Sequence, residues 1–127
     1  MKRRVLLVDD DPVLREVLST VLDLEEFAVT TAVDGEQALT LVAEEPPEVV
    51  VCDVDMPGID GFEVCRRLRA DPAASQLPVV LLTAHGGPAE QRQGVEAGCS
   101  ALLTKPFSPL ELIELLRGCT TSVGEHR

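Results

Sequence analysis

The sequence predicts an α/β fold, a doubly wound parallel sheet of five strands with helices on both faces. Short apolar runs, which are typical of strands buried on both faces, alternate with longer stretches of helical periodicity along the whole chain. Such alternation produces parallel βα units. The chain has 127 residues, the size of one domain, and its hydrophobic content of 45% excludes disorder over the whole chain.

The first unit has a strand at 5–8 and a helix that begins at Asp11-Pro12, an N-cap followed by proline at the first helical position. One helical stripe carries its apolar residues, which are Leu14, Val17, Leu18, Val21 and Leu22. The β-branched run at 27–32 predicts the second strand.

The second helix begins at Asp34, with Gln37 as a capping-box partner, and ends before Pro46-Pro47. The third strand lies at 49–52. A second capping-box pair, Asp60 and Glu63, opens the third helix.

The fourth strand is expected at 79–82. The polar helix that follows, at about 89–97, contains Gly94 and should be the least stable, because an internal glycine costs ~1 kcal/mol relative to alanine. The fifth strand lies at 100–103. A capping-box pattern at 108–111 starts the last helix.

Site chemistry gathers at the strand ends, where parallel α/β sheets place their sites. The residues there are Asp9, Asp10 and Asp11 after the first strand, Asp53 after the third, Thr83 after the fourth and Lys105 after the fifth. Asp11 is explained by its place as a helix cap, and a single threonine or lysine carries little weight. The whole set, which spans four strands, indicates a functional site.

Adjacent carboxylates at a strand end repel each other, and this repulsion raises the pKa of one of them unless a cation is present. Their oxygens suit Mg²⁺, which keeps several waters and shares a phosphoryl oxygen with its protein ligands. An ionised aspartate is a nucleophile that can form an acyl phosphate, and a lysine and a hydroxyl can hold the phosphoryl oxygens.

Four motifs together resemble the response-regulator receiver domain of two-component signalling: VDDDP at 8–12, DVDMPGIDG at 53–61, LLTA at 81–84 and KPF at 105–107. The resemblance covers nearly the whole chain. It implies a flavodoxin-like three-layer sandwich with strand order 2-1-3-4-5. It also implies a receiver domain at 1–117. The polar, aperiodic segment at 118–127 is expected to be a flexible tail or the start of a linker.

The resemblance makes Asp53 the phosphoacceptor, with a sensor histidine kinase or a histidine phosphotransfer protein as the donor. Mg²⁺, or Mn²⁺, would be bound by the Asp10 and Asp53 side chains and the backbone carbonyl of Asp55, with Asp9 acting through water. Such a protein is a phosphorylation switch that catalyses its own phosphorylation and slow dephosphorylation, and is not a classical turnover enzyme.

The resemblance also assigns phosphoryl binding and switching to Thr83, Ala84 and Lys105, with movement of the 83–88 loop. It implies a cis peptide bond before Pro106. The face formed by the fourth helix, the fifth strand and the fifth helix would then control an effector protein or domain of unknown identity.

The sequence departs from the family pattern at Leu102, a position that often carries an aromatic switch residue. The resemblance implies that Asp55 and His85 occupy positions that tune dephosphorylation. The segment 99–101 lacks the acidic pair of receivers that dimerise through salt bridges, so we expect a monomer or a weak dimer. The chain is either a stand-alone receiver or part of a longer protein.

Three other interpretations compete with this one. A pseudo-receiver would bind a partner without phosphorylation. A haloacid-dehalogenase-like phosphohydrolase would use Asp53 and Asp55, but its motif has threonine or valine where this chain has Pro57. An EF-hand calcium loop is rejected, because its twelfth position is Val64 rather than glutamate.

Charge and hydropathy limit the partners. The net charge is −11, which argues against direct binding of nucleic acid or of an anionic membrane surface. No apolar run reaches the ~20 residues of a membrane helix, and the apolar run after the basic start is too short for an export signal. We therefore expect a cytoplasmic protein.

Overall fold

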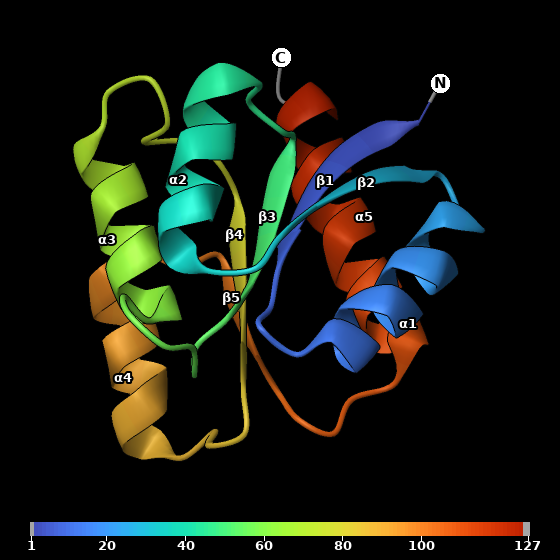
Figure 1. Ribbon diagram of the computed structural model, residues 1–127. Coiled ribbons are helices and arrows are strands. Elements are labelled where there is room, and N and C mark those ends of the chain that lie inside the picture. The colour runs from blue at the N-terminus through green and yellow to red at the C-terminus, as the bar shows by residue number, and fades with distance from the viewer. Residues whose placement is uncertain (1, 126–127) are drawn as a thin grey trace.

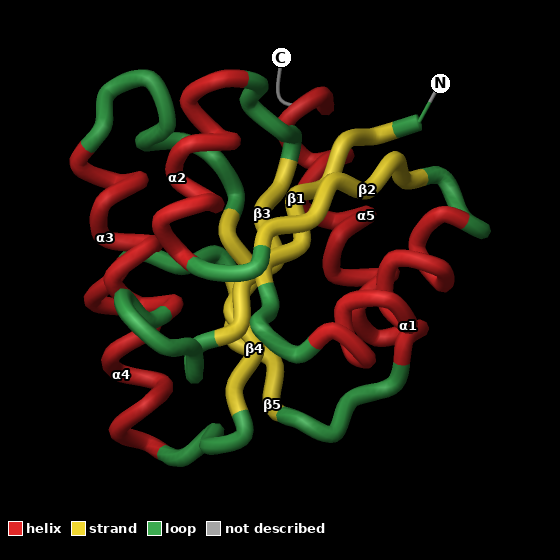
Figure 2. Tube along the Cα trace, viewed as in Figure 1, coloured by secondary structure: helices red, strands yellow, loops and turns green. Residues whose placement is uncertain are grey.

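A single parallel sheet forms the centre of the molecule (Figures 1 and 2). The computed structural model describes the backbone of residues 2–125 and the side chains of residues 2–119. The strands are β1 (Arg3–Val8), β2 (Phe27–Ala32), β3 (Val49–Asp53), β4 (Val79–Thr83) and β5 (Ala101–Thr104). Their order is β2-β1-β3-β4-β5 and every pairing is parallel, which confirms the predicted fold class and strand order.

Helices cover both faces of this sheet (Figure 1). They are α1 (Pro12–Asp23), α2 (Gly35–Glu44), α3 (Gly61–Ala70), α4 (Pro88–Ala97) and α5 (Pro109–Glu125). The core on one face is shared with α2, α3 and α4, which contribute Ala38, Val42, Phe62, Val64, Cys65, Leu68 and Ala97. The core on the other face is shared with α1 and α5, which contribute Leu18, Leu22, Leu112, Ile113 and Leu116.

The predicted capping boxes at the starts of α5 and α3 differ in whether both hydrogen bonds form. Ser108 and Glu111 form a complete capping box, because each side chain accepts the other's backbone N–H, at 3.1 and 3.0 Å. At α3 the box is incomplete. The Asp60 carboxylate caps Glu63 N at 2.8 Å, but the Glu63 carboxylate accepts from the guanidinium groups of Arg66 and Arg67 instead.

Helix α4 is polar, as predicted, and its N-cap Gly87 makes no side-chain capping hydrogen bond. The internal Gly94 has a packing reason. A Cβ atom at this position would lie 3.0 Å from Cys99 Sγ and 3.9 Å from Leu102 Cβ. Glycine therefore allows α4 to lie close to β5.

Helix α5 runs to Glu125, although a tail or linker was expected to begin at residue 118. No proline interrupts this polar segment, and each residue added to an existing helix gains a backbone hydrogen bond. The domain boundary at 117 stays a prediction. Within the described part of the chain, none of the helices is both long and apolar enough to span a membrane.

Candidate phosphoryl-transfer site

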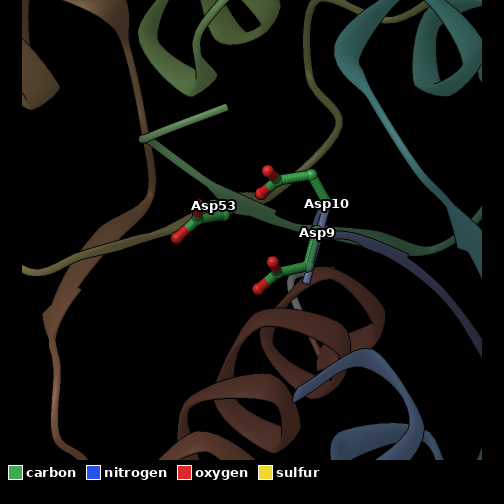
Figure 3. Close-up of side chains that lie close together, drawn as sticks. All are labelled: Asp9, Asp10 and Asp53. Carbon is green, nitrogen blue, oxygen red and sulfur yellow. The ribbon is translucent and has the colours of Figure 1, made fainter. Parts of the chain in front are cut away.

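Three carboxylates converge where β1 and β3 end (Figure 3). One ligand oxygen from each of Asp9, Asp10 and Asp53 lies within 4.8 Å of the others. Asp9 and Asp53 are 1% and 3% exposed, whereas Asp10 is exposed to solvent. β1 and β3 are neighbours in register, so the sheet itself brings the predicted residues together.

Lys105 reaches this cluster from the end of β5. Its Nζ lies 2.6 Å from Asp53 Oδ1 and 4.0 Å from Asp9 Oδ2. Burial raises the pKa of Asp53, although the hydrogen bond from Lys105 opposes the shift. Burial alone would lower the pKa of Lys105, but the hydrogen bond and the charge of Asp53 outweigh it, so the pKa of the ammonium is raised.

Asp9 carries an unsatisfied oxygen. Its Oδ1 accepts a hydrogen bond from Asp11 N at 2.9 Å, but its buried Oδ2 has no hydrogen-bond partner within residues 2–119. Burial also raises the pKa of this carboxyl, against the opposing effect of the Asp11 N–H. Buried polar atoms in native proteins normally have partners, and a water bound to a hard divalent cation would satisfy this one. The oxygen set therefore fits Mg²⁺ or Mn²⁺.

Thr83 ends β4 on the same edge of the sheet and is 1% exposed. Its Oγ1 accepts from His85 N at 3.0 Å and donates to His85 O at 3.2 Å, so the hydroxyl holds the start of the 83–88 loop. Ala84 and His85 are exposed in this loop. Lys105 N donates to Thr83 O at 2.7 Å, which ties the end of β5 to the end of β4.

The other predicted positions lie in β5 and in the loops after β3 and β5. The Lys105–Pro106 peptide bond is cis. Asp55 is exposed in the loop after β3. Leu102 is partly buried and packs against the core that α4 covers, beside Gly94.

Two residues that shape the site were not predicted from the sequence. A Cβ atom on Gly61 would lie 2.6 Å from the Asp53 carbonyl oxygen, so glycine is required for α3 to approach the backbone of β3. Arg15 Nη1 donates to the Asp9 carbonyl oxygen at 2.7 Å. The DG pair at 60–61 could have indicated the close approach, whereas one arginine in an amphipathic helix carries no distinctive pattern.

The family described as response regulator receiver domain matches residues 5–117. The chain is 42% identical to the response regulator PleD of Caulobacter vibrioides over 120 residues, which are 94% of this chain and 26% of that protein. It is 44% identical to the DNA-binding response regulator MtrA of Mycolicibacterium smegmatis over 117 residues, which are 92% of this chain and 50% of that protein. The chain thus spans half or less of these relatives.

Solved structures agree with this match. A putative response regulator from Chloroflexus aurantiacus superposes with a TM-score of 0.90 at 37% identity, covering 95% of this chain and 99% of that one. The chemotaxis response regulator CheY4 of Vibrio cholerae superposes with a TM-score of 0.88 at 31% identity, covering 94% and 99% of the two chains.

Proposed function

The chain belongs to the response regulator receiver domain family, and from that premise we propose that it is a phosphorylation-driven signalling switch of a two-component system. The observation that carries the proposal is the cluster of the Asp9, Asp10 and Asp53 carboxylates, in which Asp53 is paired with the Lys105 ammonium. The buried Asp9 Oδ2, which has no hydrogen-bond partner among the described side chains, supports a cation at this place. The phosphoryl donor is a sensor histidine kinase or a histidine phosphotransfer protein, and the protein acts in the cytoplasm as a monomer or weak dimer.

Asp53 is the proposed phosphoacceptor. Its carboxylate oxygen attacks the phosphorus of a phosphohistidine, an O–P bond forms, the N–P bond breaks, and the released imidazole nitrogen takes up a proton. The Lys105 ammonium, held at 2.6 Å from Oδ1, opposes the protonation of Asp53 that burial favours. An ionised acceptor is thus available without a general base.

Asp10 and Asp53 are the proposed side-chain ligands of Mg²⁺ or Mn²⁺, with the Asp55 backbone carbonyl as a third ligand and Asp9 acting through water. When bound there, the cation would neutralise the phosphoryl oxygens and the crowded carboxylates. Lys105 then pairs with a phosphoryl oxygen, and the amide of Ala84 lies in the segment that closes on the new group.

Thr83 is the proposed switch residue. Its hydroxyl is engaged with His85 in the unphosphorylated protein, at 3.0 and 3.2 Å. Exchange of His85 for a phosphoryl oxygen would release the 83–88 loop and the uncapped start of α4. The leucine at 102 lacks an aromatic ring to swing, so the loop and α4 carry the response. Exposed Asp55 and His85 flank the route of water and tune dephosphorylation.

The output surface is proposed on α4, β5 and α5. A groove of about 460 Å³ on it is lined by Leu102, Leu103, Glu111, Glu114 and Leu115, a mixture of apolar and acidic side chains that suits a protein partner. The DNA-binding activity named for MtrA belongs to that longer protein, and an effector of this chain is a separate protein or domain.

Chemical trapping tests the acceptor assignment. After incubation with a small acyl phosphate and Mg²⁺, borohydride reduction converts a phosphoaspartate to homoserine, which peptide mass spectrometry locates. We expect the label at residue 53. A label at another aspartate contradicts the assignment, and a protein that binds Mg²⁺ but takes up no phosphoryl group is a pseudo-receiver.

A further inference from the structure

We propose that Arg15 is a positioning residue for the metal-binding carboxylates, because its guanidinium fixes the peptide group that joins Asp9 to Asp10. This inference rests on the proposed function of the site. Arg15 lies in α1, outside the carboxylate cluster, and its side chain is directed back to the end of β1.

The contact is short and partly buried. Arg15 Nη1 donates to the Asp9 carbonyl oxygen at 2.7 Å. The backbone N–H of Arg15 donates to the Asp11 carbonyl at 3.0 Å, so the residue is fixed in the helix at its own backbone. A charged donor on a carbonyl forms a stronger hydrogen bond than a neutral one.

The contact has a geometric consequence. The Asp9 carbonyl belongs to the planar peptide group whose nitrogen is that of Asp10. Holding its oxygen therefore restricts the direction in which the Asp10 chain continues. Asp9 is further held through its backbone N–H, which donates to Ala32 O at 3.2 Å, and through its Oδ1, which accepts from Asp11 N at 2.9 Å. With these three anchors, Asp9 Oδ2 remains near Lys105 and without a hydrogen-bond partner in residues 2–119.

The choice of a carbonyl as acceptor matters for the metal. Lys105 already pairs with the carboxylate of Asp53, and a second cation on the carboxylate oxygens would compete with a divalent ion. Arg15 avoids this competition, because it orients the cluster through a backbone oxygen. Its planar guanidinium and long side chain suit this reach better than the flexible ammonium of lysine.

Titration calorimetry with MgCl₂ tests the inference directly. We expect Arg15→Met to raise the Mg²⁺ dissociation constant by about tenfold or more, the usual cost of removing a hydrogen bond that orients a metal ligand. Arg15→Lys should raise it less, because its ammonium can still donate to a carbonyl. Arg92→Met, which removes one exposed arginine from α4, is the matched control and should bind Mg²⁺ like the wild type.

A second readout separates positioning from general damage. The Mg²⁺ concentration for half-maximal phosphorylation should rise in Arg15→Met, while the rate at saturating Mg²⁺ stays within about twofold, because the acceptor itself is unchanged. Unchanged Mg²⁺ affinity in Arg15→Met overturns the inference, as does a lost maximal rate at unchanged half-saturation. If Arg15→Met does not fold, equal affinity in Arg15→Lys and in the wild type at matched circular dichroism also counts against it.

The two proposals fail differently. A wild-type protein that binds Mg²⁺ but takes up no phosphoryl group contradicts the proposed function, while the calorimetric comparison still tests Arg15. Phosphorylation at Asp53 with the same Mg²⁺ affinity in all variants contradicts only the role of Arg15.

Discussion

The ammonium of Lys105 donates a hydrogen bond of 2.6 Å to the carboxylate of Asp53, across the ends of two strands that are not neighbours. The carboxylate is almost fully buried, and the lysine side chain is 28% exposed. Burial raises the pKa of Asp53, whereas this pairing opposes that shift. The contact therefore favours the ionised form of a buried carboxylate.

Removal of the lysine should separate metal binding from switching. We expect Lys105→Met to bind Mg²⁺, because the carboxylates remain, but to lose the phosphorylation-induced change in its NMR spectrum. Without metal, the variant should be less stable by about 2 kcal/mol, the scale of a hydrogen bond between charged groups. Urea unfolding of the double variant with Asp53→Asn is the control, since removal of both partners should recover much of the loss. A severe loss of Mg²⁺ affinity in Lys105→Met would contradict the placement of the lysine.

The buried carboxyl of Asp9 should make stability depend on pH. Burial raises its pKa in the folded protein, so the folded state holds a proton that the unfolded state releases above about pH 4. This contribution to stability is therefore lost as pH rises from the unfolded pKa through the raised one. We expect Asp9→Asn to have the same free energy of unfolding as the metal-free wild type near pH 3. Above that pH window, the variant should become the more stable of the two. A difference in urea midpoint between the two proteins that stays constant with pH would contradict a raised pKa of Asp9.

Bound Mg²⁺ should stabilise the fold through the acidic cluster. A ligand that binds only the folded state adds about 2.7 kcal/mol at 100 times its dissociation constant. Thermal unfolding with MgCl₂ and with EDTA measures this gain, which Asp10→Asn should largely remove. The same charge change at exposed Glu16, made as Glu16→Gln, should keep the gain. An equal gain in all three proteins would place the cation elsewhere.

The close approach at Gly61 should be intolerant of a methyl group. A Cβ atom would meet the Asp53 carbonyl oxygen at 2.6 Å and Val54 Cα at 2.9 Å, and both are backbone atoms. We expect Gly61→Ala to cost about 1–3 kcal/mol in urea unfolding and to slow phosphorylation, because β3 must shift. Gly118→Ala is the opposite case. A Cβ atom at this exposed position would meet no atom of another part of the structure within 4 Å, so alanine should stabilise α5 by up to about 1 kcal/mol. A neutral effect at Gly61 would show that α3 adapts without moving Asp53.

Much of the fold and of the site follows from local sequence patterns. Apolar runs mark each strand, and the residue just beyond a run marks the carboxyl edge, which is why Asp9, Asp53, Thr83 and Lys105 could be placed together. The strand order came from the family resemblance, because periodicity does not determine which strands are neighbours.

Other features depend on contacts that the sequence does not encode locally. Glu63 has the right spacing for a capping box, but two arginines one turn further along α3 compete for its carboxylate. The contacts of Arg15 and Gly61 depend on how closely α1 and α3 approach the strand ends. The last helix extends past Gly118, although no apolar pattern in that segment predicts a helix.

Intact-protein mass spectrometry tests the central claim most directly. Wild type and Asp53→Asn are incubated with a small acyl phosphate, each with Mg²⁺ and with EDTA. We predict one phosphoryl adduct, formed only by the wild type and only with Mg²⁺. An adduct of equal yield on Asp53→Asn, or one that forms equally well in EDTA, would contradict the account of Asp53 as a metal-dependent phosphoacceptor.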